Sequence, residues 1–412
     1  MGIVNETRDN VTGGNMSKFI VFCADGTWNG PGQPGPAGEG SAITNVLKAY
    51  RMLAGTPSTP DAEFACEQEK VLTDSQGRAL QIAKYIDGVG DSTNWLVHTV
   101  GGDFGAGMIA RIVRGYTFVS RNYEPGDKIV LLGFSRGAYT ARALGGLIAG
   151  QGLLDKHKLD LSDKNQAYLW GCSAWRTYRA ATCGDEGFLQ KLAEAAPMLD
   201  TLRTQPPQPG DYLAAPIEAI AVWDTVGSLG IPDIQGGVNL DLFRFVNCTL
   251  ASSVGHGFHA VSADERRGNF TPTLWDEDSR VVQVLFPGAH ADVGGGYPSE
   301  DNESGLSDCA LQWMAGKLRE IGVVAGPPAA PFRPDAAGVA HAPWRDMPWR
   351  ALASGPRELR AGLTVSQSLG DRLALQEVIE YPGAAPAPYT PAALGAYMTG
   401  RALKASVPIA QT

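Results

Sequence analysis

The chain has 412 residues, of which 44% are hydrophobic, and it carries a formal net charge of −9 at pH 7. Such a chain can bury a substantial core, either as one large domain with insertions or as two domains. The acidic balance, without any block of Lys or Arg, argues against nucleic acid or an anionic membrane as a partner held by charge alone.

The N-terminus and the cysteines both indicate in which compartment the protein is made and folds. The N-terminal sequence MGIVNETRDNVTGGNMSK lacks the apolar segment of a signal peptide, and no apolar run reaches the roughly 18 residues of a membrane-spanning helix. We therefore expect a protein made in the cytoplasm, although export without a cleaved signal would leave no mark in the sequence. The six cysteines form no C-x-x-C pair, which argues against a zinc site of that kind and favours reduced thiols.

The first third of the chain predicts strands and helices in alternation. Apolar β-branched runs predict buried strands, and apolar residues three and four apart predict helices. The expected elements are a disordered segment 1–16, a strand and loop over 18–30, a Gly/Pro-rich loop over 30–40, a helix over 43–53, a strand and loop over 81–92, and a helix over 108–123.

The same alternation continues after residue 128, with one interruption. The expected elements are a strand over 128–134, a helix over 136–147, an insertion over 151–214 with a helical-looking segment 188–202, a strand over 217–224, a helical-looking run around His256 and His259, a strand over 281–286 and a helix over 306–322. Fully apolar strands alternating with helices indicate an α/β fold with a mostly parallel sheet covered on both faces. We expect the core to span 17–325, with a Pro/Ala-rich extension, 326–412, packing on it.

One pentapeptide lies where chemistry is expected, Gly133-Phe134-Ser135-Arg136-Gly137. In α/β hydrolases a G-x-S-x-G sequence between a strand and a helix is the nucleophile elbow, whose glycines let the turn close and expose the Ser hydroxyl. The pentapeptide alone is a weak signal in a chain with 51 glycines, and an ordinary strand-to-helix turn is the alternative. The apolar strand before it and the helical run after it favour the elbow, with Ser135 as nucleophile.

A Ser hydroxyl needs a base, and the base needs an acid that orients it. In this fold the chain order is Ser, then Asp or Glu, then His. His290, directly after the strand 281–286, is the predicted base, and Asp224, at the end of the strand 217–224, is the predicted acid. Asp224 could instead cap a helix, and Asp264 and Asp292 remain alternative acids.

An oxyanion hole needs two backbone N–H groups directed at the developing charge. One should come from Arg136, directly after the nucleophile, and the second from Gly26 or Thr27 in the loop after the first strand. The glycine-rich segment 102–107 could cradle phosphate, but its spacing is not G-x-G-x-x-G and no strand leads into it. It is better explained by a loop or a close helix contact.

Together these motifs resemble a known family, the α/β-hydrolase domain family that contains the catalytic domain of type VI secretion phospholipase effectors. The matching stretches are FCADGTWN, YIDGVGDS, GFSRGAYTARALGGLI, AVWDTVGSLGIP, FHAVSADERRGNFTPTLW and LFPGAHADVGGGYP, with a weaker match at VSQSLGDRL. The resemblance covers residues 18–396. It implies a nucleophile at Ser135 with Asp224 and His290 as partners, a lipid or phospholipid ester as substrate, and an immunity or secretion protein as partner.

The sequence therefore predicts a serine ester hydrolase of the α/β-hydrolase fold that needs no metal or organic cofactor. Two alternatives remain: a cytoplasmic esterase or thioesterase acting on small acyl substrates, and a catalytically silent binding module of the same fold. No transmembrane segment is expected, and contact with a membrane would be peripheral.

The insertion 151–214 carries three aromatic residues, Trp170, Trp175 and Tyr178. Such side chains suit an acyl chain, so the insertion could form a helical cap whose inner face binds substrate beside Ser135. The alternative is that these aromatics pack the core of the insertion itself.

Overall fold

A computed structural model gives the fold of this chain. It describes residues 17–26, 43–58, 67–88, 103–183, 205–226, 248–327, 332–347, 349–351, 353–400 and 402–410. The expectations for segment 1–16, for Thr27 and for the helical-looking segment 188–202 lie outside these residues.

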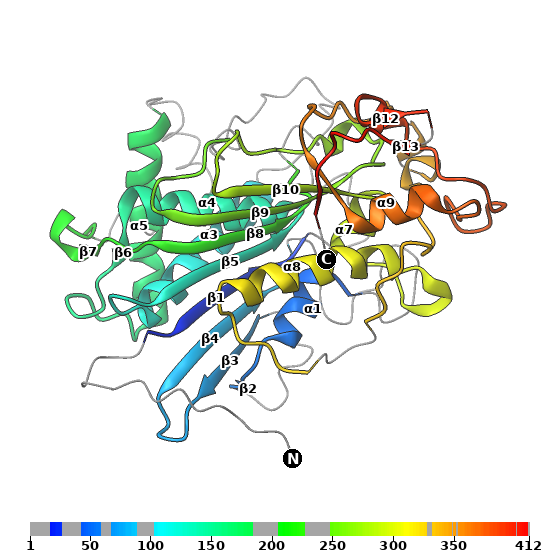
Figure 1. The fold of residues 1–412 in the computed structure, drawn as a ribbon. Helices are drawn as coiled ribbons and strands as arrows, with labels where there is room; N and C mark the ends of the chain where they lie inside the picture. Colours follow the sequence, from blue (N-terminus) through cyan, green and yellow to red (C-terminus); the bar gives the residue numbers. More distant parts are fainter. Residues whose placement is uncertain are drawn as a thin grey trace, which may run out of the picture.

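The apolar runs form the central strands of one large sheet (Figure 1). Within the described part of the chain its order is β14-β11-β10-β9-β8-β5-β1-β4-β3-β2. The strands are β1 (Phe19–Ala24), β2 (Thr56–Pro57), β3 (Glu67–Thr73), β4 (Ala79–Ile86), β5 (Lys128–Phe134), β8 (Ile217–Trp223), β9 (Val254–Ser262), β10 (Val281–Phe286), β11 (Thr364–Ser366) and β14 (Ile409–Ala410). Neighbours are parallel from β14 to β4, whereas β3 and β2 are antiparallel at one edge.

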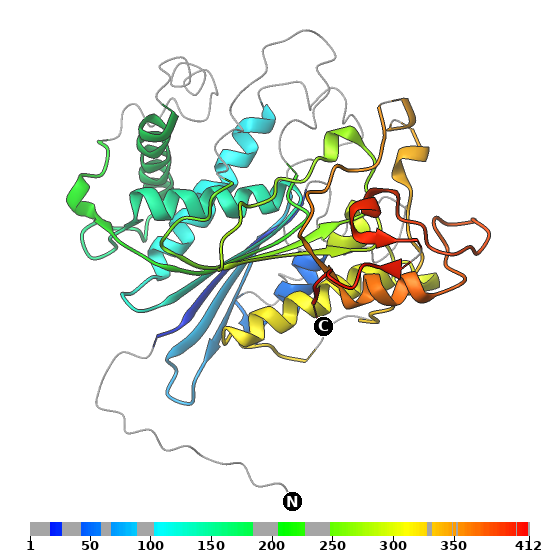
Figure 2. The same ribbon diagram turned by 45° about the horizontal axis from the view of Figure 1, so that its top comes forward.

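Helices cover both faces of this sheet (Figures 1 and 2). They are α1 (Asn45–Met52), α3 (Asp103–Asn122), α4 (Arg136–Gln151), α5 (Lys164–Cys183), α7 (His290–Gly294), α8 (Gly305–Glu320) and α9 (Gln367–Ala374). Ile20 and Phe22 of β1 pack in the cluster that contains α3, α4 and α5, whereas Val21 and Cys23 pack in the cluster that contains α1 and α8. Successive residues of a strand point to opposite faces, so strands covered on both faces must be apolar throughout. The predicted α/β-hydrolase arrangement is confirmed.

The residues after 325 do more than pack on the core. They contribute β11 and β14 to the edge of the main sheet beyond β10, and α9 packs beside them. A third apolar cluster joins Val261 and Leu285 of the central sheet to Val365 and Leu369 of this C-terminal part. The C-terminal residues are therefore continuous with the sheet that carries the candidate site.

The insertion is anchored at the edge of the sheet where the parallel strands begin. Its two ends pair as the short antiparallel strands β6 (Leu153–Leu154) and β7 (Tyr212–Leu213), the first after the end of α4 and the second before the start of β8. Another two-stranded ribbon, β12 (Met398–Thr399) with β13 (Ala402–Leu403), lies in the C-terminal part. The two ends of the insertion therefore lie near the amino ends of the parallel strands, whereas Ser135 lies at the carboxyl end of β5.

Four further local findings bear on the sequence predictions. The helix predicted around His256 and His259 is wrong, because both residues lie in strand β9, which is buried from Gly257 to Ser262. The segment beginning at Asp103 is the first part of helix α3. Among the cysteines whose side chains the structure describes, Cys23, Cys172, Cys248 and Cys309 are free thiols. No helix among the described residues is long and apolar enough to cross a membrane.

Candidate active site

Ser135 occupies a strained turn between β5 and α4. Its backbone has φ 56° and ψ −121°, a region that L-residues rarely adopt. Its N–H donates to the carbonyl of Trp223 on the neighbouring strand, at 3.1 Å. Ser135 is thereby held at the end of β5, in the strand–turn–helix geometry that the pentapeptide predicts.

The two glycines of the pentapeptide are required by close backbone contacts. A Cβ atom on Gly133 would lie 2.3 Å from the carbonyl oxygen of Gly137, and one on Gly137 would lie 2.1 Å from the carbonyl oxygen of Ala24. Real Cβ atoms do not approach other atoms so closely. Only glycine at both positions lets α4 begin directly against the ends of β5 and β1.

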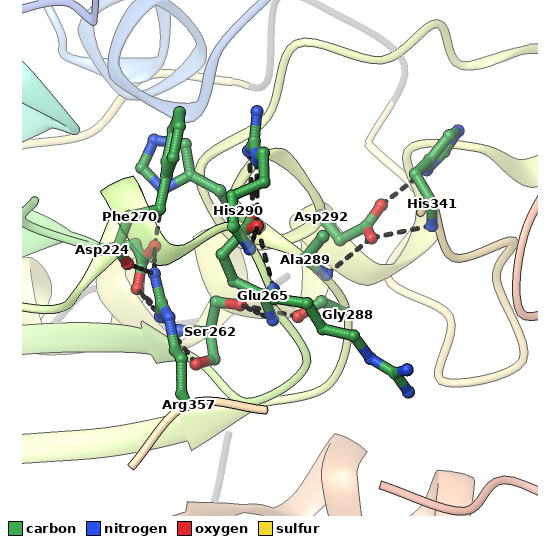
Figure 3. Close-up of polar contacts among 12 residues, drawn as sticks. Asp224, Ser262, Glu265, Phe270, Gly288, Ala289, His290, Asp292, His341 and Arg357 are labelled. Atoms are coloured by element: carbon green, nitrogen blue, oxygen red, sulfur yellow. Dashed lines mark hydrogen bonds and ion pairs between the residues drawn. The ribbon is translucent and has the colours of Figure 1, made fainter. Parts of the chain in front are cut away.

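Asp224 and His290 meet at the same edge of the sheet. Phe134 and Trp223 are register partners on β5 and β8, so Ser135 and Asp224 follow side by side. His290 begins α7, just beyond β10. Its Nδ1 lies 2.5 Å from Oδ2 of Asp224 (Figure 3). The base and the acid expected from the sequence are therefore hydrogen-bonded partners.

Aromatic rings bracket the imidazole of His290. The ring of Phe134, the residue before Ser135, lies 4.6 Å from it between centroids, and the ring of Phe270 lies 4.9 Å away at a steep angle. Burial lowers the pKa of His290 below its usual value, against the opposing effect of Asp224. Near neutral pH the imidazole is thus uncharged, which is the form that can accept a proton.

Neither the Ser135 hydroxyl nor Nε2 of His290 has a hydrogen-bond partner within the described part of the chain. No other described residue therefore occupies either atom. In ligand-free enzymes such contacts are often long and close only when substrate binds.

Asp224 has a second partner that no sequence pattern predicts. The guanidinium of Arg357, 133 residues away, donates to both carboxylate oxygens, Nη1 to Oδ1 at 2.7 Å and Nη2 to Oδ2 at 2.8 Å (Figure 3). Ser262 N–H also donates to Oδ1, at 2.9 Å. Burial alone would raise the pKa of Asp224, but Arg357 and His290 hold it far below the usual value. Asp224 is therefore a permanent anion.

The alternative acids bind other groups. Asp264 accepts from Gly288 N–H at 2.7 Å and from the Tyr389 hydroxyl at 2.6 Å. Asp292 accepts from Ala289 N–H at 2.8 Å and from His341 (Figure 3). Both carboxylates brace the loop that carries His290, and neither contacts the His290 ring.

Of the expected oxyanion-hole residues, Arg136 is placed best. It begins α4, and the first N–H groups of a helix have no acceptor within it. The Gly26 N–H is already engaged, because it donates to Oδ1 of Asp25 at 2.7 Å. Asp25 also accepts from Thr44 and Tyr85, and burial raises its pKa to about 7. Gly26 therefore presents no free donor here.

The aromatic residues of the insertion lie within helix packing. Trp175 is fully buried and Tyr178 nearly so, in the cluster shared by α3, α4 and α5. Trp170 packs against the same cluster and is partly exposed. This packing favours the alternative that these residues form the core of the insertion.

Three residues of the site went unnoticed in the sequence. Besides Arg357, they are Phe270, whose ring meets His290 edge to face, and Glu265, whose Oε2 accepts from His290 N–H at 3.2 Å. Glu265 and Phe270 lie in DERRGNF, directly after β9. Reading β9 as a strand would have placed this segment at the reactive edge of the sheet, between Asp224 and His290.

Comparison with known proteins gives this site a context. The chain is 28% identical over 275 residues to uncharacterized protein YEL023C of Saccharomyces cerevisiae, covering 64% of the chain and 35% of that protein. Among solved structures it is similar to an uncharacterized protein from Pseudomonas aeruginosa (16% identity, TM-score 0.40, 75% of this chain and 46% of that one). It is also similar to the Tle1 effector bound to the VgrG spike of the type 6 secretion system (18% identity, TM-score 0.33, 71% and 56%).

The chain thus spans about a third to a little over half of the length of these relatives. Residues 18–317 match the family model described as T6SS, phospholipase effector Tle1-like, catalytic domain. Because this match covers well over half of the chain, the chain belongs to the Tle1-like family of type VI secretion phospholipase effector catalytic domains.

Proposed function

We propose that this protein is a serine hydrolase that cleaves a carboxylic ester through an acyl-enzyme on Ser135, with His290 as base and Asp224 as the acid that orients it. The observation that carries the proposal is the hydrogen bond between His290 Nδ1 and Asp224 beside the strained Ser135 turn. It leaves Nε2 facing away from the acid, as a general base requires.

The reaction follows from these positions. The Ser135 oxygen attacks the ester carbonyl carbon while Nε2 of His290 takes the hydroxyl proton, and the carbonyl oxygen gains the negative charge. The Arg136 N–H, at the positive end of α4, would stabilise that charge. Collapse of the intermediate expels the alcohol, which takes the proton from His290. Water then attacks the acyl-enzyme with His290 again as base, releasing the acid and restoring Ser135.

The description of the family as phospholipase effectors favours a phospholipid as the ester substrate. We propose cleavage of an acyl ester of a glycerophospholipid at a membrane surface. Purified protein should release fatty acid from phosphatidylcholine or phosphatidylglycerol vesicles, and Ser135→Ala should not. Turnover of only short, soluble acyl esters would identify a small-substrate esterase instead. Folded wild type that hydrolyses neither substrate would identify a binding module.

The aromatic residues of the insertion remain candidates for the acyl-binding surface, and chain length tests them. Trp175→Ala should lower the free energy of unfolding by about 3–5 kcal/mol, because it empties a packed core position. If these aromatics only support the core, turnover of decanoyl and acetyl esters should fall in equal proportion. A loss confined to the decanoyl ester would assign the insertion to substrate binding.

We also propose that the protein is delivered as a type VI secretion effector, in keeping with the description of its family. A host with an active type VI apparatus should release the tagged protein, and a host whose apparatus has been inactivated should retain it. Equal release from both hosts would exclude this route.

A further inference from the structure

The catalytic acid proposed above is held by a residue outside the part of the chain that matches the family model. Arg357 lies 40 residues beyond that match, which ends at residue 317. Its side chain is 4% exposed, and that of Asp224 is fully buried. A guanidinium that donates to both oxygens of one carboxylate fixes the orientation of the carboxylate as well as its charge.

The position of Arg357 is itself fixed by backbone contacts. Segment 353–357, called the strap below, runs antiparallel to residues 266–268 of the loop that follows β9. Gly268 N–H donates to the carbonyl of Ala353 at 3.2 Å, and Gly355 N–H donates to the carbonyl of Arg266 at 2.8 Å. The strap therefore delivers Arg357 to Asp224 from the C-terminal part of the chain.

Arg357 also joins the loops around the site. Its Nη1 donates to the carbonyl of Ser262 at 2.8 Å, and its Nη2 donates to the carbonyl of Phe270 at 2.6 Å (Figure 3). The ring of Phe270 in turn contacts the His290 ring edge to face. One side chain thus contacts the acid directly and also the backbone of the residue whose ring flanks the base.

The charges around His290 form two neutral pairs. Asp224 pairs with Arg357, and Glu265, on the loop after β9, pairs with Arg267 at 2.8 Å. The buried His259 of β9 is uncharged, because burial lowers its pKa to about 3. Loss of the Arg357 charge would leave one uncompensated carboxylate in contact with the imidazole.

We propose that Arg357 is a positioning residue, which orients Asp224 toward Nδ1 of His290 and keeps the Asp224–His290 pair free of an additional proton. This inference rests on the proposed function. An unpaired, buried carboxylate favours a proton on itself or on its histidine partner. Either proton disables the base, since catalysis needs an ionised Asp224 and a neutral His290. Arg357 therefore extends the active pH range toward acid.

The test separates the charge of Arg357 from its geometry. We would measure kcat/KM from pH 4 to 9 with a soluble butyryl ester for wild type, Arg357→Met, Arg357→Lys and Arg360→Met. Arg360 lies three residues after Arg357, is exposed, and serves as the matched control. The Nδ1 proton resonance of His290 reports its protonation by NMR without any substrate.

Arg357→Met should move the acid limb of kcat/KM upward by about one pH unit or more, together with the His290 titration. Arg357→Lys should keep the limb near its wild-type position but lower kcat roughly tenfold, because an ammonium cannot bind both oxygens in a fork. Arg360→Met should match wild type in both respects.

Two results would overturn the inference. One is a folded Arg357→Met protein whose limb and His290 titration coincide with those of wild type. The other, decisive even where Arg357→Met does not fold, is full kcat in Arg357→Lys. Absence of ester turnover in wild type would contradict the proposed function alone, since the NMR titration would still show whether Arg357 controls protonation of the pair.

Discussion

Two aspartate–histidine pairs meet at the start of α7, where His290 and Asp292 lie two residues apart. Only the pair that contains His290 is placed for the proposed catalysis. His290 Nδ1 lies 2.5 Å from Asp224, and His341 Nδ1 lies 2.6 Å from Asp292 (Figure 3). Both carboxylates are fully buried. Judged by this contact alone, the two pairs are equivalent.

The surroundings of the two pairs set them apart. Asp224 is neutralised by Arg357, and burial keeps the pKa of His290 low. His341 faces two carboxylates, with Glu303 3.4 Å from its Nε2, and these raise its pKa above the usual value despite burial. The surroundings therefore favour the neutral form of His290, whose Nε2 has no partner among the described residues, and the charged form of His341, whose two ring nitrogens both face carboxylates.

This difference shows that an Asp–His hydrogen bond does not by itself make a catalytic pair. Burial of the imidazole and the charges around it together decide whether the histidine is neutral. The second pair has a structural task, because Asp292 also accepts from Ala289 N–H and His341 N–H. It ties the loop before His290 to the C-terminal part of the chain.

The largest expected effect comes from replacing each acid in turn. Asp224→Asn should lower kcat by roughly 10³ to 10⁴-fold, because the imidazole loses its tautomer and orientation. Asp292→Asn should stay within about tenfold of wild type while it lowers stability. Steady-state kinetics with one soluble ester checks both. Reversal of the two effects would assign catalysis to the Asp292–His341 pair and contradict the account.

A smaller effect should appear in stability. His341→Gln should lower the free energy of unfolding by about 2 kcal/mol or more at pH 6, because it leaves buried Asp292 without its cation. The pKa of His341 is raised in the folded protein, so its contribution is complete below the unfolded value near 6.5 and is lost as pH rises through the folded value. Urea titrations at pH 6 and pH 9 should show a shrinking difference between the two proteins. A difference that grows with pH would contradict a cationic His341.

The smallest effect is the pH dependence of turnover by wild type. Because the pKa of His290 is lowered, the acid limb of kcat/KM should lie below pH 6.5. The sign for stability is opposite to that of His341, since the unfolded chain binds the His290 proton more tightly and acid therefore favours unfolding. An acid limb above pH 7 would show that Asp224 outweighs burial at this histidine.

Local pattern predicted the frame of the molecule and the three central residues of the site. Strands β1, β5, β8 and β10 are long apolar runs, and Ser135, Asp224 and His290 each follow one of them. Residues at the carboxyl ends of neighbouring parallel strands meet at one edge. Their proximity could therefore be expected without knowing any distance.

The remainder depends on contacts that leave no local signal. Arg357 lies between short stretches of irregular chain, and nothing near it in the sequence indicates a partner 133 residues away. β11 has three residues and β14 has two, too few for a recognisable period. In β9 the two glycines and two histidines interrupt the alternation of apolar and polar residues by which a strand is recognised. Burial of the insertion's aromatics likewise depends on helices elsewhere in the chain.

The central claim is that Ser135 is the nucleophile and that His290 and Asp224 activate it. The most direct measurement is mass spectrometry of the protein after reaction with a fluorophosphonate, which modifies activated serines, followed by peptide mapping. We expect one adduct on wild type, located at Ser135, no adduct on Ser135→Ala, and labelling slowed at least roughly a hundredfold in Asp224→Asn. An adduct at another serine, or labelling of Ser135 at the same rate in Asp224→Asn as in wild type, would contradict the account.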